Sequence, residues 1–193
     1  MLPISREKAI EILKSQNPEE FDLIHYRMSE AVMKEVANLL GEDTNYFGML
    51  GLLHDVDWTL TKKEVSTHLT LAPEILESLG FDKEFIEIVL SHGYGFEALP
   101  ELKNKVRTKK IEWALAASET LTGLIYAYAL MRNKRVSDMQ VKGLKKKFKD
   151  KAFAAGCDRD IILEIEKTGL TLDQLFEAGI TGITKIKSEI GLE

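Results

Sequence analysis

Hydrophobic residues recur along the chain at intervals of three and four positions, and polar or charged residues fill the positions between them. This spacing places hydrophobic side chains on one face of an α-helix, which completes a turn every 3.6 residues. No segment alternates between apolar and polar residues as a half-buried strand would. The pattern therefore predicts an all-α protein, a bundle of about eight or nine helices. We expect these helices at residues 5–15, 18–40, 44–56, 62–79, 83–92, 108–131, 137–150, 158–167 and 171–190.

Local signals for helix ends support several of these boundaries. A capping box, in which polar side chains at the start of a helix satisfy free backbone N–H groups, is predicted at four segments: Asn17–Glu20, Thr61–Glu64, Ser137–Gln140 and Thr171–Gln174. Glycine ends helices because it readily adopts a left-handed conformation, and we expect this at Gly41, Gly80, Gly93 and Gly156. Pro73 is expected to kink or split the helix predicted at 62–79.

The composition is that of a globular protein, with 45% hydrophobic and 30% charged residues in 193. We expect a helical core at residues 1–131 and a C-terminal helical extension at 132–193 that packs on it. The amphipathic stretch from Asp158 to Glu193 either caps the bundle or forms a homodimer contact, and the sequence leaves both alternatives open. No apolar run approaches the roughly 20 residues that a membrane span requires. Because Cys157 is the only cysteine and no signal peptide is evident, we expect a cytoplasmic protein without membrane contact.

Charge is unevenly distributed along the chain. The net charge of −5 argues against general nucleic-acid binding, but the segment from Met131 to Lys151 carries seven net positive charges. Such a segment can attract an anionic ligand. A solvated lysine face is the simpler reading for most of its lysines, since consecutive positions on a helix do not face one site.

Four histidines provide the first chemical signal: His25, His54, His68 and His92. Helical spacing places each of them on an apolar face, and His68 is expected to share a helix face with Val65 and Ile75. A single histidine on such a face is more often a core residue with one hydrogen bond. Burying four imidazoles separately would require four sets of polar partners. A shared cation satisfies all four at once.

Carboxylates accompany these histidines. Asp55 follows His54 directly, and their side chains project about 100° apart on a helix, so that they can bind one metal ion or Asp55 can bridge two. Gly48 and Gly51 leave room for a close helix contact beneath Asp55. Glu119 lies on an apolar face among small residues, and it is either a ligand or a half-buried glutamate bonded to a threonine. Imidazole and carboxylate without thiolate suit Mn, Fe, Ni, Co, Zn or Mg, with one or two ions per chain.

These residues in this order resemble the HD-domain (HDIG-type) metal-dependent phosphohydrolase superfamily. The similarity covers His25, the pair His54–Asp55 and the distant acid Glu119, and His68 and His92 match the variant that holds a second metal. The segment Val141–Ala154 is similar to the branch of small, uncharacterised bacterial and archaeal HD hydrolases. One difference is that the last ligand of the family is usually Asp, whereas this chain has Glu119.

The resemblance implies hydrolysis of a phosphomonoester or phosphodiester, with a nucleotide as one candidate substrate, by a metal-activated water. We assign the catalytic role to Asp55, with Asp57 as an outer base or an orienter of a ligand. The alternative for Asp57 is a surface acid near a helix end. Lys146 and Lys149 are the candidates for neutralising the phosphate of a small substrate. The alternatives are a metal- or nucleotide-binding regulatory module with weak catalysis, a di-iron enzyme of the oxygenase type, and a purely structural helical protein.

Overall fold

The computed structural model describes residues 2–193, and over that range the chain forms helices and turns without a strand. The predicted all-α class is therefore confirmed. The α-helices are α1 (Arg6–Ser15), α2 (Glu20–Leu40), α3 (Thr44–Leu53), α4 (Trp58–Thr61), α5 (Ala72–Ser78), α6 (Lys83–Ser91), α7 (Lys110–Met131), α8 (Val141–Lys149), α9 (Arg159–Leu163) and α10 (Leu172–Lys185). Three short 3-10 helices accompany them: η1 (Val65–Thr67), η2 (Glu164–Thr168) and η3 (Lys187–Ile190).

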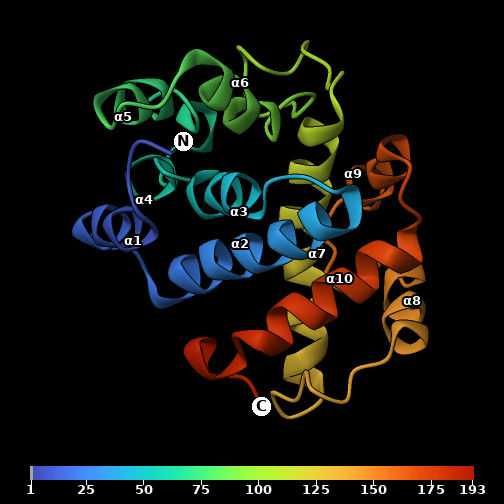
Figure 1. The fold of residues 1–193 in the computed structure, drawn as a ribbon. Helices are drawn as coiled ribbons and strands as arrows, with labels where there is room; N and C mark the ends of the chain where they lie inside the picture. Colours follow the sequence, from blue (N-terminus) through green and yellow to red (C-terminus); the bar gives the residue numbers. More distant parts are fainter. Residues whose placement is uncertain (1) are drawn as a thin grey trace.

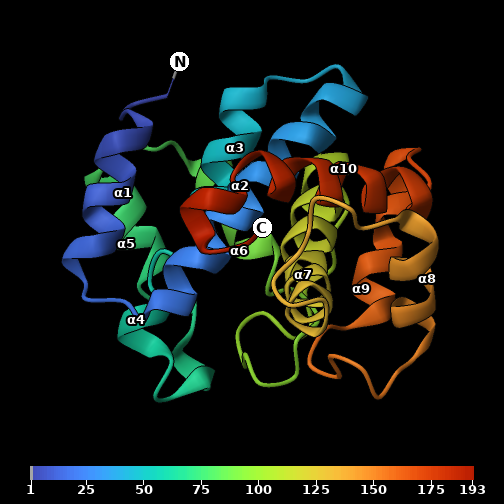
Figure 2. The same ribbon diagram turned by 90° about the horizontal axis from the view of Figure 1, so that it is seen from below.

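Helix α7 forms the centre of the bundle. It has buried residues on several sides, which is typical of a helix enclosed by others. Figure 2 views α7 nearly along its axis, with α8 and α9 on one side and α1, α4 and α5 on the other. Helix α2 crosses it on a third side, α3 packs on α2, and α10 packs on both α2 and α7 (Figure 1).

By length and composition, α7 is also the one helix among residues 2–193 that could cross a membrane, and 56% of its most apolar window is buried in the fold. The expectation that no apolar segment approaches this length was therefore wrong. A buried core helix passes the same test of composition, and α7 contributes Leu115, Leu121 and Leu124 to the main hydrophobic cluster.

Helix α2 packs closely against α3 and α10, and a glycine lies at each of these two contacts. A Cβ on Gly51 of α3 would lie 2.5 Å from the carbonyl oxygen of Ser29 on α2. A Cβ on Gly182 of α10 would lie 2.6 Å from the carbonyl oxygen of Ala31. Both contacts are with backbone, which cannot move aside as a flexible side chain can. The close helix contact expected at Gly51 is confirmed.

Several predicted helix ends are confirmed. Gly41 has φ 72° and ends α2, and Gly80 has φ 86° just after α5. The capping box at Thr171 and Gln174 starts α10. At the start of α2 the box is formed by Glu19 and Asp22 instead of Asn17 and Glu20.

Two predicted helices were wrong. The region 62–79 is not one helix, because it contains η1, a turn and the short helix α5. Pro73 lies in the first turn of α5, so the split expected at this proline is confirmed. The box predicted at Ser137 does not form. The backbone N–H groups of Val136 and Ser137 both donate to the carbonyl of Glu193, and α8 begins only at Val141.

The substitution Gly51→Ala tests the contact between α2 and α3. We expect it to lower the free energy of unfolding by about 1–3 kcal/mol, because the new methyl group meets backbone. Urea denaturation measures the change. Gly156→Ala is the matched control, since a Cβ there meets nothing within 4 Å. Equal stability of the two variants would contradict this account of the packing.

Candidate metal centre

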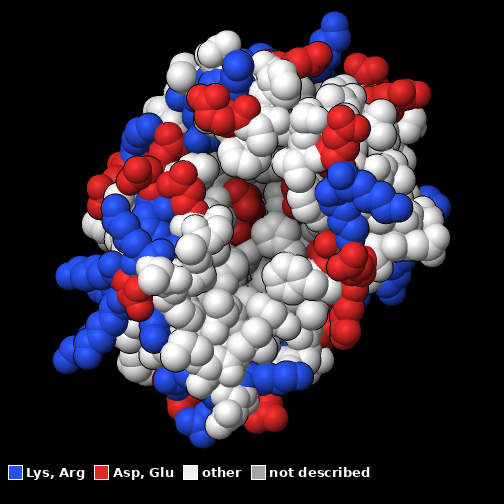
Figure 3. Space-filling model, turned by 180° about the vertical axis from the view of Figure 1, so that it is seen from behind, with Lys and Arg blue, Asp and Glu red and all other residues white. Residues whose placement is uncertain are grey.

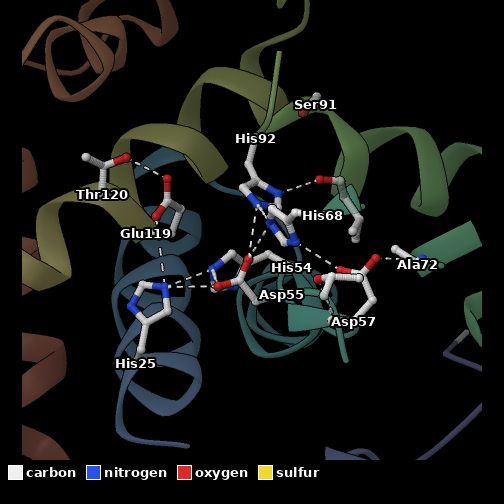
Figure 4. Close-up of polar contacts among 12 residues, drawn as sticks. His25, His54, Asp55, Asp57, His68, Ala72, Ser91, His92, Glu119 and Thr120 are labelled. Carbon is white, nitrogen blue, oxygen red and sulfur yellow. Dashed lines mark hydrogen bonds and ion pairs between the residues drawn. The ribbon is translucent and has the colours of Figure 1, made fainter. Parts of the chain in front are cut away.

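The four histidines come from four different elements and converge. His25 lies on α2, His54 and His92 are the C-cap residues of α3 and α6, and His68 directly follows η1. Figure 4 shows all four rings directed towards Asp55. The structure therefore brings the predicted histidine ligands together. His68 reaches this position from a turn, and the helix face predicted for it does not exist.

The first ligand group comprises His25, His54, one oxygen of Asp55, and Glu119. The Nε2 atoms of His25 and His54 are 3.0 Å apart, and they lie 3.6 and 3.4 Å from Asp55 Oδ2. Glu119 Oε2 approaches from α7 to 4.0 Å from His25 Nε2. His25, His54 and Glu119 each offer a ligand atom within 4.8 Å of the others, a set that could hold a metal ion.

The second ligand group comprises His68, His92 and the other oxygen of Asp55. Both Nε2 atoms lie 3.2 Å from Asp55 Oδ1, and they are 3.4 Å from each other. Asp55 therefore presents one oxygen to each group, which is the arrangement of a bridging carboxylate. His54, Asp55 and His92 also form a set with the spacing of metal ligands.

These spacings fit a coordinated cation. Two ligand atoms at about 2.1 Å from one ion, separated by an angle between octahedral and tetrahedral, lie roughly 3.0–3.4 Å apart. Within the two groups, the distances among the imidazoles and Asp55 are 3.0–3.6 Å and fall in or near this range, whereas Glu119 at 4.0 Å from His25 lies outside it. Two neutral imidazoles that both carry their N–H at Nδ1 face each other with lone pairs at Nε2, so each facing pair needs either a metal ion or a shared proton between its nitrogens.

The tautomers of the imidazoles support the same conclusion. Each Nδ1 faces an oxygen: His54 faces the Gly51 carbonyl at 2.8 Å, His92 the Val89 carbonyl at 2.7 Å, and His68 the Asp57 carboxylate at 3.0 Å.

His25 Nδ1 lies 2.9 Å from the hydroxyl of Thr122, which itself donates to the Glu119 carbonyl and so accepts from the ring. With Nδ1 as donor in all four rings, every Nε2 is free to bind a cation.

The pKa values of the cluster indicate that protons on the imidazoles can supply the positive charge that a bound cation would otherwise supply. Burial by itself would raise the pKa of Asp55, but the imidazoles of His54, His68 and His92 hold that pKa well below its usual range. Burial lowers the pKa of His25 to about 4. Burial also opposes charge on His68, yet Asp55 and Asp57 raise its pKa to about 9. Protons on Nε2 thus compete with a metal ion for the same positions.

Asp57 lies behind the cluster and is fully buried. Besides His68 Nδ1, its carboxylate accepts from the backbone N–H groups of Leu71 and Ala72 at 3.1 and 3.2 Å. It therefore fixes the orientation of His68, and it also caps the N-terminus of α5, 14 residues later in the chain. Because these contacts occupy it and it is not exposed, the alternative role as an outer base does not fit this position.

The sequence left open whether Glu119 is a metal ligand or a half-buried glutamate bonded to a threonine, and its carboxylate has features of both. Thr120 donates to its Oε1 at 2.5 Å, while its Oε2 faces His25. Burial raises the pKa of Glu119. The longer side chain of glutamate thus brings a carboxylate oxygen to the edge of the first ligand group.

A cavity of about 560 Å³ opens onto the first ligand group and is lined by His25, Asp55 and Glu119 among others. Lys146 and Lys149 do not line it. They border a separate groove between α8 and α10 with Lys142, Lys145 and Asp173. The prediction that these two lysines neutralise a phosphate at the metal centre is therefore corrected, because their stripe of α8 faces away from the cavity.

Two residues that position the histidines, Arg107 and Thr122, were not predicted from the sequence. Arg107 donates from Nη1 to the carbonyls of Ser91, His92 and Tyr94, and so holds the end of α6 that carries His92. Thr122 sets the tautomer of His25. No local pattern marks Arg107, because it lies 15 residues after His92 and reaches the end of α6 only in the folded chain.

Comparisons of this chain with protein-family models, curated proteins and solved structures find no match.

Metal binding should stabilise the fold, because the ligand atoms converge only in the folded state. A free ion at about 100 times its Kd adds about 2.7 kcal/mol to the free energy of unfolding. We expect Mn²⁺, Co²⁺ or Zn²⁺ to raise Tm and EDTA to reverse the effect, measured by calorimetry. Asp55→Ala should abolish the shift, since Asp55 presents one carboxylate oxygen to each ligand group. An identical Tm with and without every ion tested would contradict a metal site.

The role of Asp57 is tested by Asp57→Asn, which keeps the shape but loses the charge. We expect binding at the second ligand group to weaken by about 10–100-fold, because a residue that orients a histidine ligand has effects of this size. Titration calorimetry with elemental analysis should show that binding at the first group persists. The control is Glu177→Gln, which removes a carboxylate charge in the same way at an exposed position on α10. Unchanged affinity in Asp57→Asn would refute the orienting role.

Proposed function

We propose that this chain is a metal-dependent phosphoric ester hydrolase of the HD type. The observation that supports this most is the set of four imidazoles held through Nδ1, whose Nε2 atoms surround a two-oxygen carboxylate beside a cavity. A purely structural protein has no need to assemble such a set, since each buried imidazole would be satisfied by separate partners.

Each ligand has a defined part in the proposal. His25, His54, Asp55 and Glu119 would hold one divalent cation, and His68, His92 and Asp55 would hold a second. Bound cations lower the pKa of a water molecule and withdraw charge from a phosphoryl oxygen. Asp55 aligns the two groups, and Asp57 keeps His68 in place.

The reaction is hydrolysis and needs no redox partner. Water adds to phosphorus, the P–O bond to the organic group breaks, and that oxygen leaves as an alcohol after taking a proton. A monoester yields inorganic phosphate and the alcohol, and a diester yields a phosphomonoester and the alcohol. The cavity lies at the first ligand group, so the substrate would enter where His25 and Glu119 are accessible.

A phosphatase screen with p-nitrophenyl phosphate, bis-p-nitrophenyl phosphate and nucleotides tests the proposal, with Mn²⁺, Co²⁺, Ni²⁺ and Mg²⁺ supplied in turn. We expect turnover with at least one metal and a loss of at least about 100-fold in His54→Ala and Asp55→Ala. Lys146→Ala should keep full activity, because Lys146 lies outside the cavity.

Three other outcomes would each count against the proposal. Absence of turnover with any metal, in protein shown to bind metal, would favour a regulatory module. Full activity in Asp55→Ala would show that the hydrolysis comes from elsewhere. Purified protein that contains iron and forms a product only with oxygen would favour oxidative chemistry.

A further inference from the structure

The cavity has an unusual balance of charge for a site that binds phosphates. Apart from the histidine ligands and their two acids, its lining contains three more carboxylates, on Glu19, Asp22 and Asp158. Lys62 is the one Lys or Arg in the lining. Figure 3 shows a hollow with acidic atoms inside it and uncharged atoms over much of its border, which matches this lining.

Lys62 is not free to serve a phosphate. Its Nζ lies 2.8 Å from Glu19 Oε1 and 2.8 Å from Asp22 Oδ2. Asp22 is nearly buried, so the pair is fixed against the wall of the cavity. The group formed by Lys62, Glu19 and Asp22 carries a net negative charge, and Asp158 adds to it.

The remaining lining is aromatic and apolar. Phe21 and Phe96 are each about half exposed although they border the cavity, and Trp58 also lines it and packs against His68. The volume of about 560 Å³ lies within the usual range for sites of small organic molecules. Aromatic side chains at such a site provide contact area for a flat, uncharged group.

We infer that the substrate is a phosphate ester with a single phosphate group and an uncharged, ring-containing organic part, and that the site discriminates against polyphosphates. This inference rests on the proposed function. One phosphoryl group finds its counter-charge in the metal centre. A second or third phosphate in the cavity would meet carboxylates without a free cation, which is unfavourable in a partly desolvated site.

The experiment compares nucleoside mono-, di- and triphosphates and p-nitrophenyl phosphate with the metal-loaded enzyme. We expect kcat/KM for release of phosphate to be at least about tenfold higher for single-phosphate esters than for the triphosphate, since like charges suppress the wrong partner. Equal or better hydrolysis of the triphosphate would overturn the inference while leaving the proposed function intact. A lack of turnover on all substrates would instead refute the proposed function.

A double variant, Glu19→Gln with Asp158→Asn, tests the cause. Both changes remove charge with little change of shape, and Asn retains the helix-capping ability of Asp158. We expect the preference for monophosphate over triphosphate to fall by at least threefold, through a lower KM for the triphosphate. The control variant, Glu42→Gln with Glu177→Gln, loses the same charge at exposed positions outside the cavity. An equal shift in the control would show that net charge, and not the cavity, sets the preference.

The aromatic lining is tested by Phe21→Ala and Phe96→Ala. Both side chains are largely exposed, so folding should be preserved. We expect KM for p-nitrophenyl phosphate to rise at least threefold and KM for glycerol phosphate to stay within twofold. Equal effects on both substrates, or none on either, would show that these rings do not contact the organic part.

Discussion

The central constraint of this structure is that four imidazoles share a small volume with each Nδ1 already engaged. His54 and His92 direct Nδ1 at carbonyls, His68 at Asp57, and His25 at a threonine hydroxyl. The Nε2 atoms are thereby turned towards one another, and neutral rings in that arrangement repel through their lone pairs. A positive charge must lie among them, as protons or as metal ions. The placement of Asp55, Glu119 and Asp57 follows from this requirement.

The C-termini of α3 and α6 orient two of the four imidazoles. The last carbonyls of a helix lack partners within the helix. His54 and His92 each occupy a C-cap and donate from Nδ1 to the carbonyl three residues earlier. The same backbone geometry thus terminates α3 and α6 and orients one ligand in each ligand group. Gly51 has two functions for this reason, because its carbonyl accepts from His54 and its missing side chain lets α3 approach α2.

Much of the fold and of the candidate site could be predicted from the sequence, because helical periodicity is a local property. The inward direction of His25, His54 and His92 follows from their apolar neighbours, and the pairing of His54 with Asp55 is visible in the sequence itself. Pro73 gave a local signal for the break in the helix expected at 62–79, but it did not show where the segment between α4 and α5 turns. There Asp57 accepts from the backbone of Leu71 and Ala72, and the segment before α8 donates to the carbonyl of Glu193. Both contacts join residues that are distant in sequence, so neither could be predicted from the segment itself.

The basic segment shows why charge along a sequence does not locate a binding site. Lys142, Lys145, Lys146 and Lys149 have helical spacing and form one stripe on α8, so the sequence correctly indicates a concentrated positive face. The direction of that face is set by how α8 packs, and Leu144 turns the opposite side of the helix into the core. The stripe consequently faces a groove beside α10, where Asp173 pairs with Lys145. The cavity beside the imidazole cluster is left acidic, so positive charge offered to a phosphate there would come from the protons or metal ions that this cluster holds.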